Sequence, residues 1–229
     1  MTRNGELIDL LTCHAKAGRG TQHRMARAQN FYVETIKAEA GASAFPIRSA
    51  YEMMLLLPDV AATIEGSGKA VDAKARSVVI VPAGEFGVRL AGAGSCYVLK
   101  SNSGEIDGAA VANHATYARA DPRVAPFGPP YARRSAPDAI RVFDIDALQA
   151  PKDNPRLKML QSATMSINWV EYEGPRDRKS LSPHSHADFE QGSLALAGEF
   201  RHHLRVAWGS NADLWRDDLH AWRRRRPPC

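Results

Sequence analysis

The feature that most constrains the fold is a series of short runs rich in Val, Ile and Leu, each bounded by Gly, Pro or Asp. Such runs between turn-forming residues predict strands, and strands at this spacing are typical of an all-β sandwich or barrel. The expected strands cover residues 51–57, 60–64, 77–81, 86–90 and 96–99, followed by 141–145, 164–173, 192–196 and 199–206.

The chain of 229 residues is long enough for one large or two small cores. Residues 1–45 mix Gly, His and Arg without a sustained apolar face near their start, so a loosely attached leader is expected there. Proline is frequent after residue 120, and because it cannot donate to a ladder we expect a linker over 121–150. We therefore expect a first β-domain at 46–120 before this linker, a second β-domain at 151–222 after it, and a basic tail at 223–229.

Cysteine use and apolar length indicate the compartment. Cys13, Cys96 and Cys229 lie far apart without CxxC spacing, so neither a disulfide framework nor a cysteine zinc site is predicted, and a cytoplasmic location fits best. The apolar runs are much shorter than a membrane span, so no membrane association is expected.

The positive charge is concentrated at one end of the chain. The net charge is +5, and the four arginines at 223–226 supply four of these charges. No nucleic-acid footprint is therefore expected on the folded body. The arginine run itself leaves open a localisation signal or a phosphate-binding tail.

Two histidines form the strongest candidate site. On a strand, His184 and His186 would point to the same face about 7 Å apart, so both imidazoles could bind one metal ion. An oxygen of Glu190 or Gln191 would add a ligand, and because neighbouring strand residues face opposite ways, only one of these two can bind directly. This donor set suits a divalent Fe, Mn, Ni or Zn ion and leaves positions for substrate or water.

The spacing of these residues resembles the first motif of the cupin superfamily. That motif is Gly, five residues, His-x-His, three or four residues, Glu, six residues and Gly. His184, His186, Glu190 and Gly198 fall close to it, while Gln191 stands at the usual glutamate register. The glycine that precedes the histidines departs from the pattern, because Gly174 lies ten residues before His184 instead of six.

The first predicted domain resembles the other cupin motif, which is Gly, five residues, Pro-x-Gly, two residues and His. Its counterpart is the run 76–87, where Pro82-Ala83-Gly84 forms the corner and Gly87 replaces the histidine. Matching the turn glycine Gly66 to Gly198 places Glu52 over His184, Met54 over His186 and Asp59 over Gln191. The resemblance thus implies a bicupin, with two double-stranded β-helix (jelly-roll) barrels of which the first lacks metal ligands.

The second barrel is expected to be incomplete. After Val206-Ala207-Trp208 there is no second Pro-x-Gly corner and no clear third histidine, so a truncated or frameshifted C-terminus is expected. His220, or one of the adjacent pair His202 and His203, remains an alternative third ligand.

The resemblance implies a bacterial, metal-dependent enzyme of the dioxygenase, isomerase or decarboxylase class acting on a small organic acid or sugar. The alternative is a non-catalytic ligand-binding or interaction protein. A small-molecule ligand is expected in either case, and exposed edge strands of an incomplete barrel would favour self-association, with a homodimer as the simplest form.

Overall fold

The computed structural model describes residues 8–10, 16–18, 20–42, 44–102, 111–128, 130, 138–171, 174, 177, 179, 189–198, 200–201, 204–205, 215–216 and 220–221. Over these residues the regular structure is β, apart from one 3-10 helix, η2 (His114–Tyr117), which confirms the all-β class. The strands are β1 (Lys16–Ala17), β2 (Thr21–Arg27), β3 (Phe31–Ala38), β4 (Phe45–Ser49), β5 (Met53–Leu57), β6 (Ala62–Gly66), β7 (Lys69–Ala73), β8 (Ser77–Val81), β9 (Gly84–Leu90), β10 (Gly94–Ser101), β11 (Arg141–Asp144), β12 (Leu157–Gln161), β13 (Ser166–Val170), β14 (Phe200–Arg201), β15 (Leu204–Arg205), β16 (Trp215–Arg216) and β17 (His220–Ala221).

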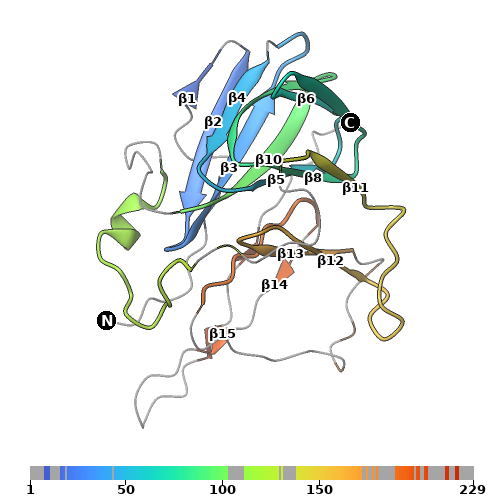
Figure 1. Ribbon diagram of the computed structural model, residues 1–229. Helices are drawn as coiled ribbons and strands as arrows, with labels where there is room; N and C mark the ends of the chain where they lie inside the picture. The colour runs from blue at the N-terminus through green and yellow to red at the C-terminus, as the bar shows by residue number, and fades with distance from the viewer. Residues whose placement is uncertain are drawn as a thin grey trace, which may run out of the picture.

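Two antiparallel sheets face each other in the first part of the chain (Figure 1). Within the described residues the larger sheet has the order β1-β2-β3-β10-β5-β8-β11, and the smaller has the order β4-β9-β6-β7. Strands far apart in sequence are neighbours, since β10 lies between β3 and β5. Crossovers of this kind distinguish a jelly-roll barrel from a set of consecutive hairpins.

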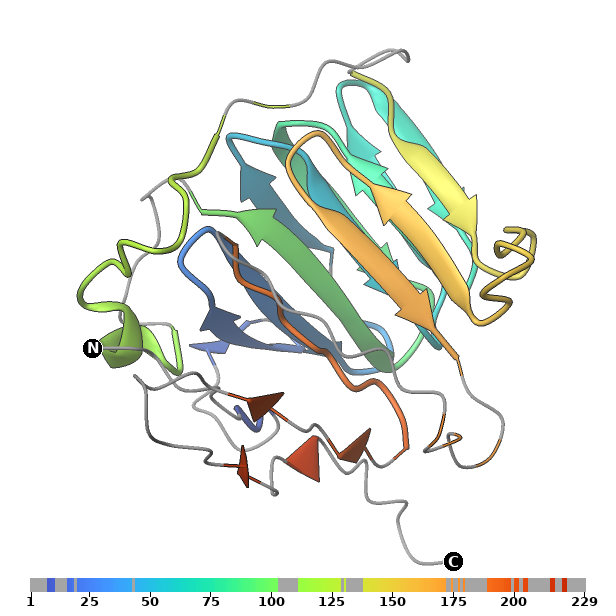
Figure 2. The ribbon, with the colours of Figure 1, turned by 90° about the horizontal axis from the view of Figure 1, so that it is seen from below.

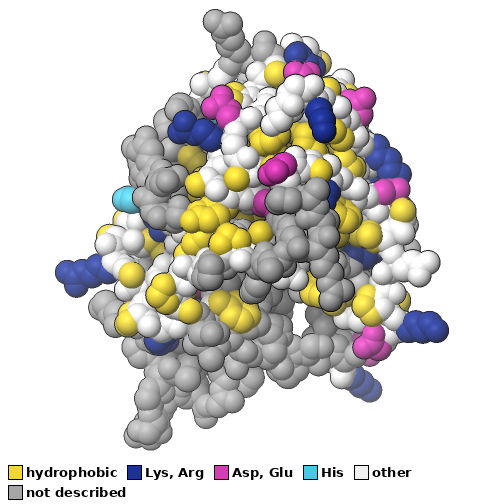
Figure 3. Space-filling view, in the orientation of Figure 1, with side chains coloured by type: hydrophobic (Ala, Val, Ile, Leu, Met, Phe, Trp, Pro, Cys, Tyr) yellow, Lys and Arg dark blue, Asp and Glu magenta, His cyan; other side chains and the backbone are white. Residues whose placement is uncertain are grey.

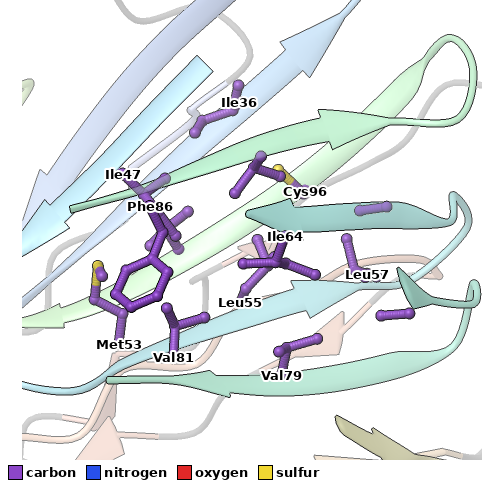
Figure 4. Close-up of a cluster of buried hydrophobic side chains, with 14 of the residues drawn as sticks. Ile36, Ile47, Met53, Leu55, Leu57, Ile64, Val79, Val81, Phe86 and Cys96 are labelled. Carbon is purple, nitrogen blue, oxygen red and sulfur yellow. The ribbon is translucent and has the colours of Figure 1, made fainter. Parts of the chain in front are cut away.

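The space between the two sheets is filled by apolar side chains (Figure 4). Because successive strand residues face opposite ways, Met53, Leu55 and Leu57 of β5 point into this core while Met54 and Leu56 point out of it. Val79 of the neighbouring strand β8 and Ile64 of β6 in the facing sheet contribute to the same core and are fully buried. The interior of the barrel is therefore packed core.

The outer face of the larger sheet is covered as well. Leu160 and Trp169 of the hairpin β12–β13 pack against Met54, Ile80 and Leu99, and Figure 2 shows the hairpin lying over the sheet. Burial on both faces explains why β5 and β8 are apolar at almost every position instead of alternating.

Glycines fix two of the turns. Ser67 and Gly68, which join β6 to β7, both have positive φ, at 51° and 73°. Positive φ at both central residues is typical of the two-residue hairpin turn whose twist matches the flanking strands. Gly84 has a φ of 123° at the Pro82-Ala83-Gly84 corner, a conformation that favours glycine.

The N-terminal segment differs from the expected leader. Residues 21–27 and 31–38 form β2 and β3, which pair with each other, and β3 also pairs with β10 along eight residues. The prediction missed these strands because charged side chains interrupt their apolar alternation. Glu34, for example, is buried in the middle of β3.

The boundary between the two halves also differs from the prediction. β11, which lies within the stretch expected as a linker, pairs with β8 and forms an edge of the larger sheet. Residues 192–196, expected to be a strand, have no ladder partner within the described residues. In the same part of the chain, the described strands form three separate two-stranded sheets, in which β12 pairs with β13, β14 with β17 and β15 with β16.

The surface in the view of Figure 3 carries apolar side chains in its middle, with Lys, Arg, Asp and Glu side chains spread around them. The large apolar side chains exposed in the described residues are Val142, Met159, Val170 and Phe189. No helix in these residues has the length and apolarity to cross a membrane.

Candidate functional site

The predicted metal ligands are only partly described. His184 and His186 lie outside the described residues. Glu190 is half-buried, and its Oε2 accepts a hydrogen bond from the backbone N–H of Gln29 at 2.6 Å, whereas Gln191 is exposed. This hydrogen bond attaches Glu190 to the β2–β3 turn of the first barrel.

The residues that follow Glu190 lie against the larger sheet. Ala195 is buried, and Leu194 and Leu196 pack on the outer-face cluster that contains Trp169. A Cβ added at Gly192 would stand 3.3 Å from the ring of Phe31 in β3, so this glycine lets the segment approach the sheet closely. This packing holds residues 192–196 against the larger sheet.

In the first barrel, apolar residues occupy the inward-facing positions of β5, where metal ligands would be needed for a site inside the barrel. The sequence match placed Glu52 and Met54 at the histidine positions, but Met54 lies in the outer-face cluster, and the inward residues are Met53 and Leu55. Met54 therefore lies on the face of β5 that points away from the barrel interior. Asp59, matched to Gln191, is exposed. Neither inward residue offers an imidazole or a carboxylate.

Glu52 connects the barrel to the hairpin that covers it. Its Oε1 accepts a hydrogen bond from Arg141 at 3.0 Å and its Oε2 accepts one from the backbone N–H of Ala163 at 2.8 Å. Burial lowers the pKa of Arg141, whose charge is stabilised by this carboxylate. Glu52 therefore holds the β12–β13 connection against the larger sheet.

A cluster of charged residues lies inside the barrel, where the sequence gave no indication of one. Glu34 of β3 faces inward with Ile36, and its carboxylate is 2.8 Å from His23 Nδ1 of β2 and 2.7 Å from Lys100 Nζ of β10. The side chains of Glu34 and Lys100 are only 11% and 8% exposed. We call His23, Glu34 and Lys100 the charged cluster.

The electrostatics of the charged cluster favour an ionised carboxylate. Burial alone raises the pKa of Glu34, but the hydrogen bond from His23 and the charge and hydrogen bond of Lys100 outweigh it, so the pKa lies below its usual value. Burial, with the charge of Glu34 as a smaller cause, raises the pKa of the Cys96 thiol. Cys96 therefore stays protonated and packs as an apolar residue.

Both ring nitrogens of His23 have partners. Its Nε2 lies 3.0 Å from the hydroxyl of Thr21, and its ring contacts the ring of Phe45 edge-on. The tautomer that satisfies both contacts donates from Nδ1 to Glu34 and accepts at Nε2 from Thr21. Nothing in the local sequence indicates this cluster, because Lys100 lies 66 residues from Glu34 in the chain.

No group of three or more His, Cys, Asp and Glu side chains suited to a metal ion occurs within the described residues. The inward side chains of β5 include no metal ligand of this kind. The charged cluster has one histidine and one carboxylate, and the ammonium group of Lys100 already occupies the carboxylate.

The crossed strand order and the two facing antiparallel sheets define the fold of the first part of the chain, a β-barrel of the jelly-roll type. No family model matches the sequence, and no curated protein matches it. Among solved structures, an RmlC-like cupin from Shewanella frigidimarina is similar at 14% identity and a TM-score of 0.39, over 46% of this chain and 97% of that one.

Two further solved structures are similar over the same share of the chain. The polyketide cyclase RemF from Streptomyces resistomycificus matches at 16% identity and a TM-score of 0.35, over 44% of this chain and 80% of that one. A mutant of the Bacillus subtilis oxalate decarboxylase OxdC matches at 11% identity and a TM-score of 0.36, over 48% of this chain and 32% of that one. These identities transfer no activity to this chain.

Proposed function

We propose that this protein is a metal-binding cupin of the bicupin type, in which His184 and His186 bind a divalent Fe, Mn, Ni or Zn ion. The His-x-His spacing, followed by Glu190 and Gln191, is the observation that carries the proposal. Two imidazoles and one oxygen ligand suit these metals and leave open positions for a small organic acid or sugar.

The first barrel would act as the scaffold of this site. Its interior is filled by apolar side chains, which supports a structural role. The hydrogen bond between Glu190 and the backbone of Gln29 supports attachment of the metal segment to this scaffold.

One of Glu190 and Gln191 would bind the metal ion, and the other would have a different role. Because Oε2 of Glu190 already accepts the Gln29 N–H, Glu190 would bind metal through its other oxygen or would only position the segment. Gln191, at the usual glutamate register, would otherwise supply the oxygen ligand and leave more positive charge on the metal.

A bound metal ion with an open coordination position favours an enzyme of the dioxygenase, isomerase or decarboxylase class. The filled first barrel favours the second candidate function, a non-catalytic ligand-binding or interaction protein. Water exchange on a bound Mn²⁺ ion, measured by NMR relaxation, distinguishes these two functions. Exchangeable water on the ion supports the enzyme, whereas a coordination sphere closed to water supports the non-catalytic protein.

The test of metal binding is elemental analysis of the full chain after growth with added metal. We expect about one ion per chain, lost in the variant His184→Ala/His186→Ala. His114→Ala is the matched control, because His114 is exposed on η2. Wild-type protein without metal, or equal metal content in the double variant, would contradict the proposal.

A further inference from the structure

A groove opens on the first barrel at the end of the core opposite Met53. It lies between the β6–β7 hairpin and the strands β8 and β11, with a volume of about 620 Å³. In Figure 4 Met53 and Phe86 lie toward one end of the core and Leu57 toward the other, and Leu57 is the strand partner of Ser77 on the groove floor. The groove is therefore separate from the inward positions Met53 and Leu55.

The walls of the groove are mostly small and apolar. Val142 of the edge strand β11 closes one side, and four alanines form much of the remaining wall: Ala61, Ala62, Ala73 and Ala91. A wall of alanines leaves room that larger side chains would fill, and its volume lies within the range of small-molecule sites.

Ser77 lies on the floor of the groove without a hydrogen-bond partner. Its strand partners are Leu57, which points into the core, and Asp144, so its side chain faces inward too. The residue is fully buried, and its hydroxyl has no partner among the described residues. A buried hydroxyl without a partner destabilises the fold. A ligand group that bonds it would remove this penalty.

Acidic side chains dominate the polar part of the lining. Asp144 is paired with Lys74 at 2.8 Å, and Asp72 accepts a hydrogen bond from the hydroxyl of Thr63 at 2.7 Å. Two carboxylates and one ammonium give this lining a net charge of −1. The Lys74 side chain is 61% exposed, so it can turn into water and leave Asp144 to another cation.

We propose that this groove binds a small alkylammonium compound, whose ammonium group replaces that of Lys74 on Asp144 and donates a hydrogen bond to Ser77. Its alkyl part lies along the alanines and Val142. An anion would be repelled by the net negative lining, and the apolar walls offer too few oxygen ligands for a bare metal ion.

The test is a titration of the full chain with n-butylammonium chloride, followed by backbone amide NMR. We expect saturable shifts confined to the stretches that line the groove, at 61–63, 72–77, 91 and 142–144, and no such shifts with 1-butanol, which lacks the charge. Asp144→Asn should weaken binding about tenfold, as loss of a charge-assisted hydrogen bond does. Glu85→Gln, which removes an exposed carboxylate at the opposite end of the barrel, should bind like wild type.

Ser77→Ala separates a binding role from a structural one. Because the hydroxyl has no partner among the described residues, the variant should keep or raise the Tm while its affinity for n-butylammonium falls. The proposal is overturned by the absence of saturable shifts, by equal affinities of Asp144→Asn and Glu85→Gln, or by a Ser77→Ala variant that loses Tm without losing affinity.

Discussion

Lys100 Nζ and Glu34 Oε2 lie 2.7 Å apart inside the barrel, on neighbouring strands that are 66 residues apart in the chain. Both side chains are almost fully buried, so each charge depends on the other. Replacing one partner leaves an uncompensated charge in the core, which is more destabilising than the loss of a surface ion pair.

Lys100→Met should therefore lower the free energy of unfolding by about 3–5 kcal/mol, measured by urea denaturation. Lys74→Met is the matched control, because its pair with Asp144 lies at the surface and should contribute little. Equal effects of the two variants would show that the buried pair has no special role.

The depressed pKa of Glu34 predicts how stability depends on pH. The carboxyl has a lower pKa in the folded protein than its usual value of 4.5, so the unfolded chain binds its proton more readily. This contribution to stability is fully present above pH 4.5 and is lost as the pH falls through the folded pKa. The groups that surround the carboxylate are His23, Lys100 and the protonated Cys96.

Urea denaturation between about pH 3 and pH 6 tests this dependence. Wild type should lose stability more steeply than Glu34→Gln as the pH falls below 4.5. Parallel curves for the two proteins would mean that another group controls acid stability.

Trp169 is predicted to hold the β12–β13 hairpin on the larger sheet. Trp169→Ala should lower the free energy of unfolding by about 3–5 kcal/mol, because the ring is 9% exposed within the outer-face cluster. Its neighbour Val170 is 42% exposed, so Val170→Ala should have a small effect. A hairpin that unfolds separately would instead give two transitions in thermal denaturation.

Gly84 is predicted to be required by its backbone conformation. At a φ of 123°, any side chain introduces strain, so Gly84→Ala should cost about 1–3 kcal/mol in the free energy of unfolding. Gly92→Ala is the control, because a Cβ there meets nothing within 4 Å and its φ is not in the positive range. Similar Tm values for both variants would contradict this account of the corner.

The sequence predicted the doubly buried strands well and the partly charged ones poorly. The apolar runs at β5 and β8 indicate strands by themselves, and Ser77–Val81 has the predicted bounds. β2 and β3 were missed because Glu34 becomes a plausible core residue only beside His23 and Lys100, which local patterns cannot reveal.

The candidate metal residues could be named from spacing alone, but their surroundings could not. Spacing left open whether Glu190 or Gln191 is the ligand, whereas the hydrogen bond from Gln29 to Glu190 depends on a contact across 161 residues. The same holds for the face on which Met54 lies, because a motif with a variable gap does not fix which face of β5 points inward.

The central proposal is that His184 and His186 together bind one metal ion. The most direct measurement is X-ray absorption of the full chain loaded with Zn²⁺, which detects imidazole ligands through their outer-shell scattering. We predict two imidazoles in wild type, with Zn–N distances of about 2.0–2.1 Å, one in His186→Ala, and two in the control His114→Ala. A spectrum with oxygen ligands alone, or one that His186→Ala leaves unchanged, would contradict the proposed site.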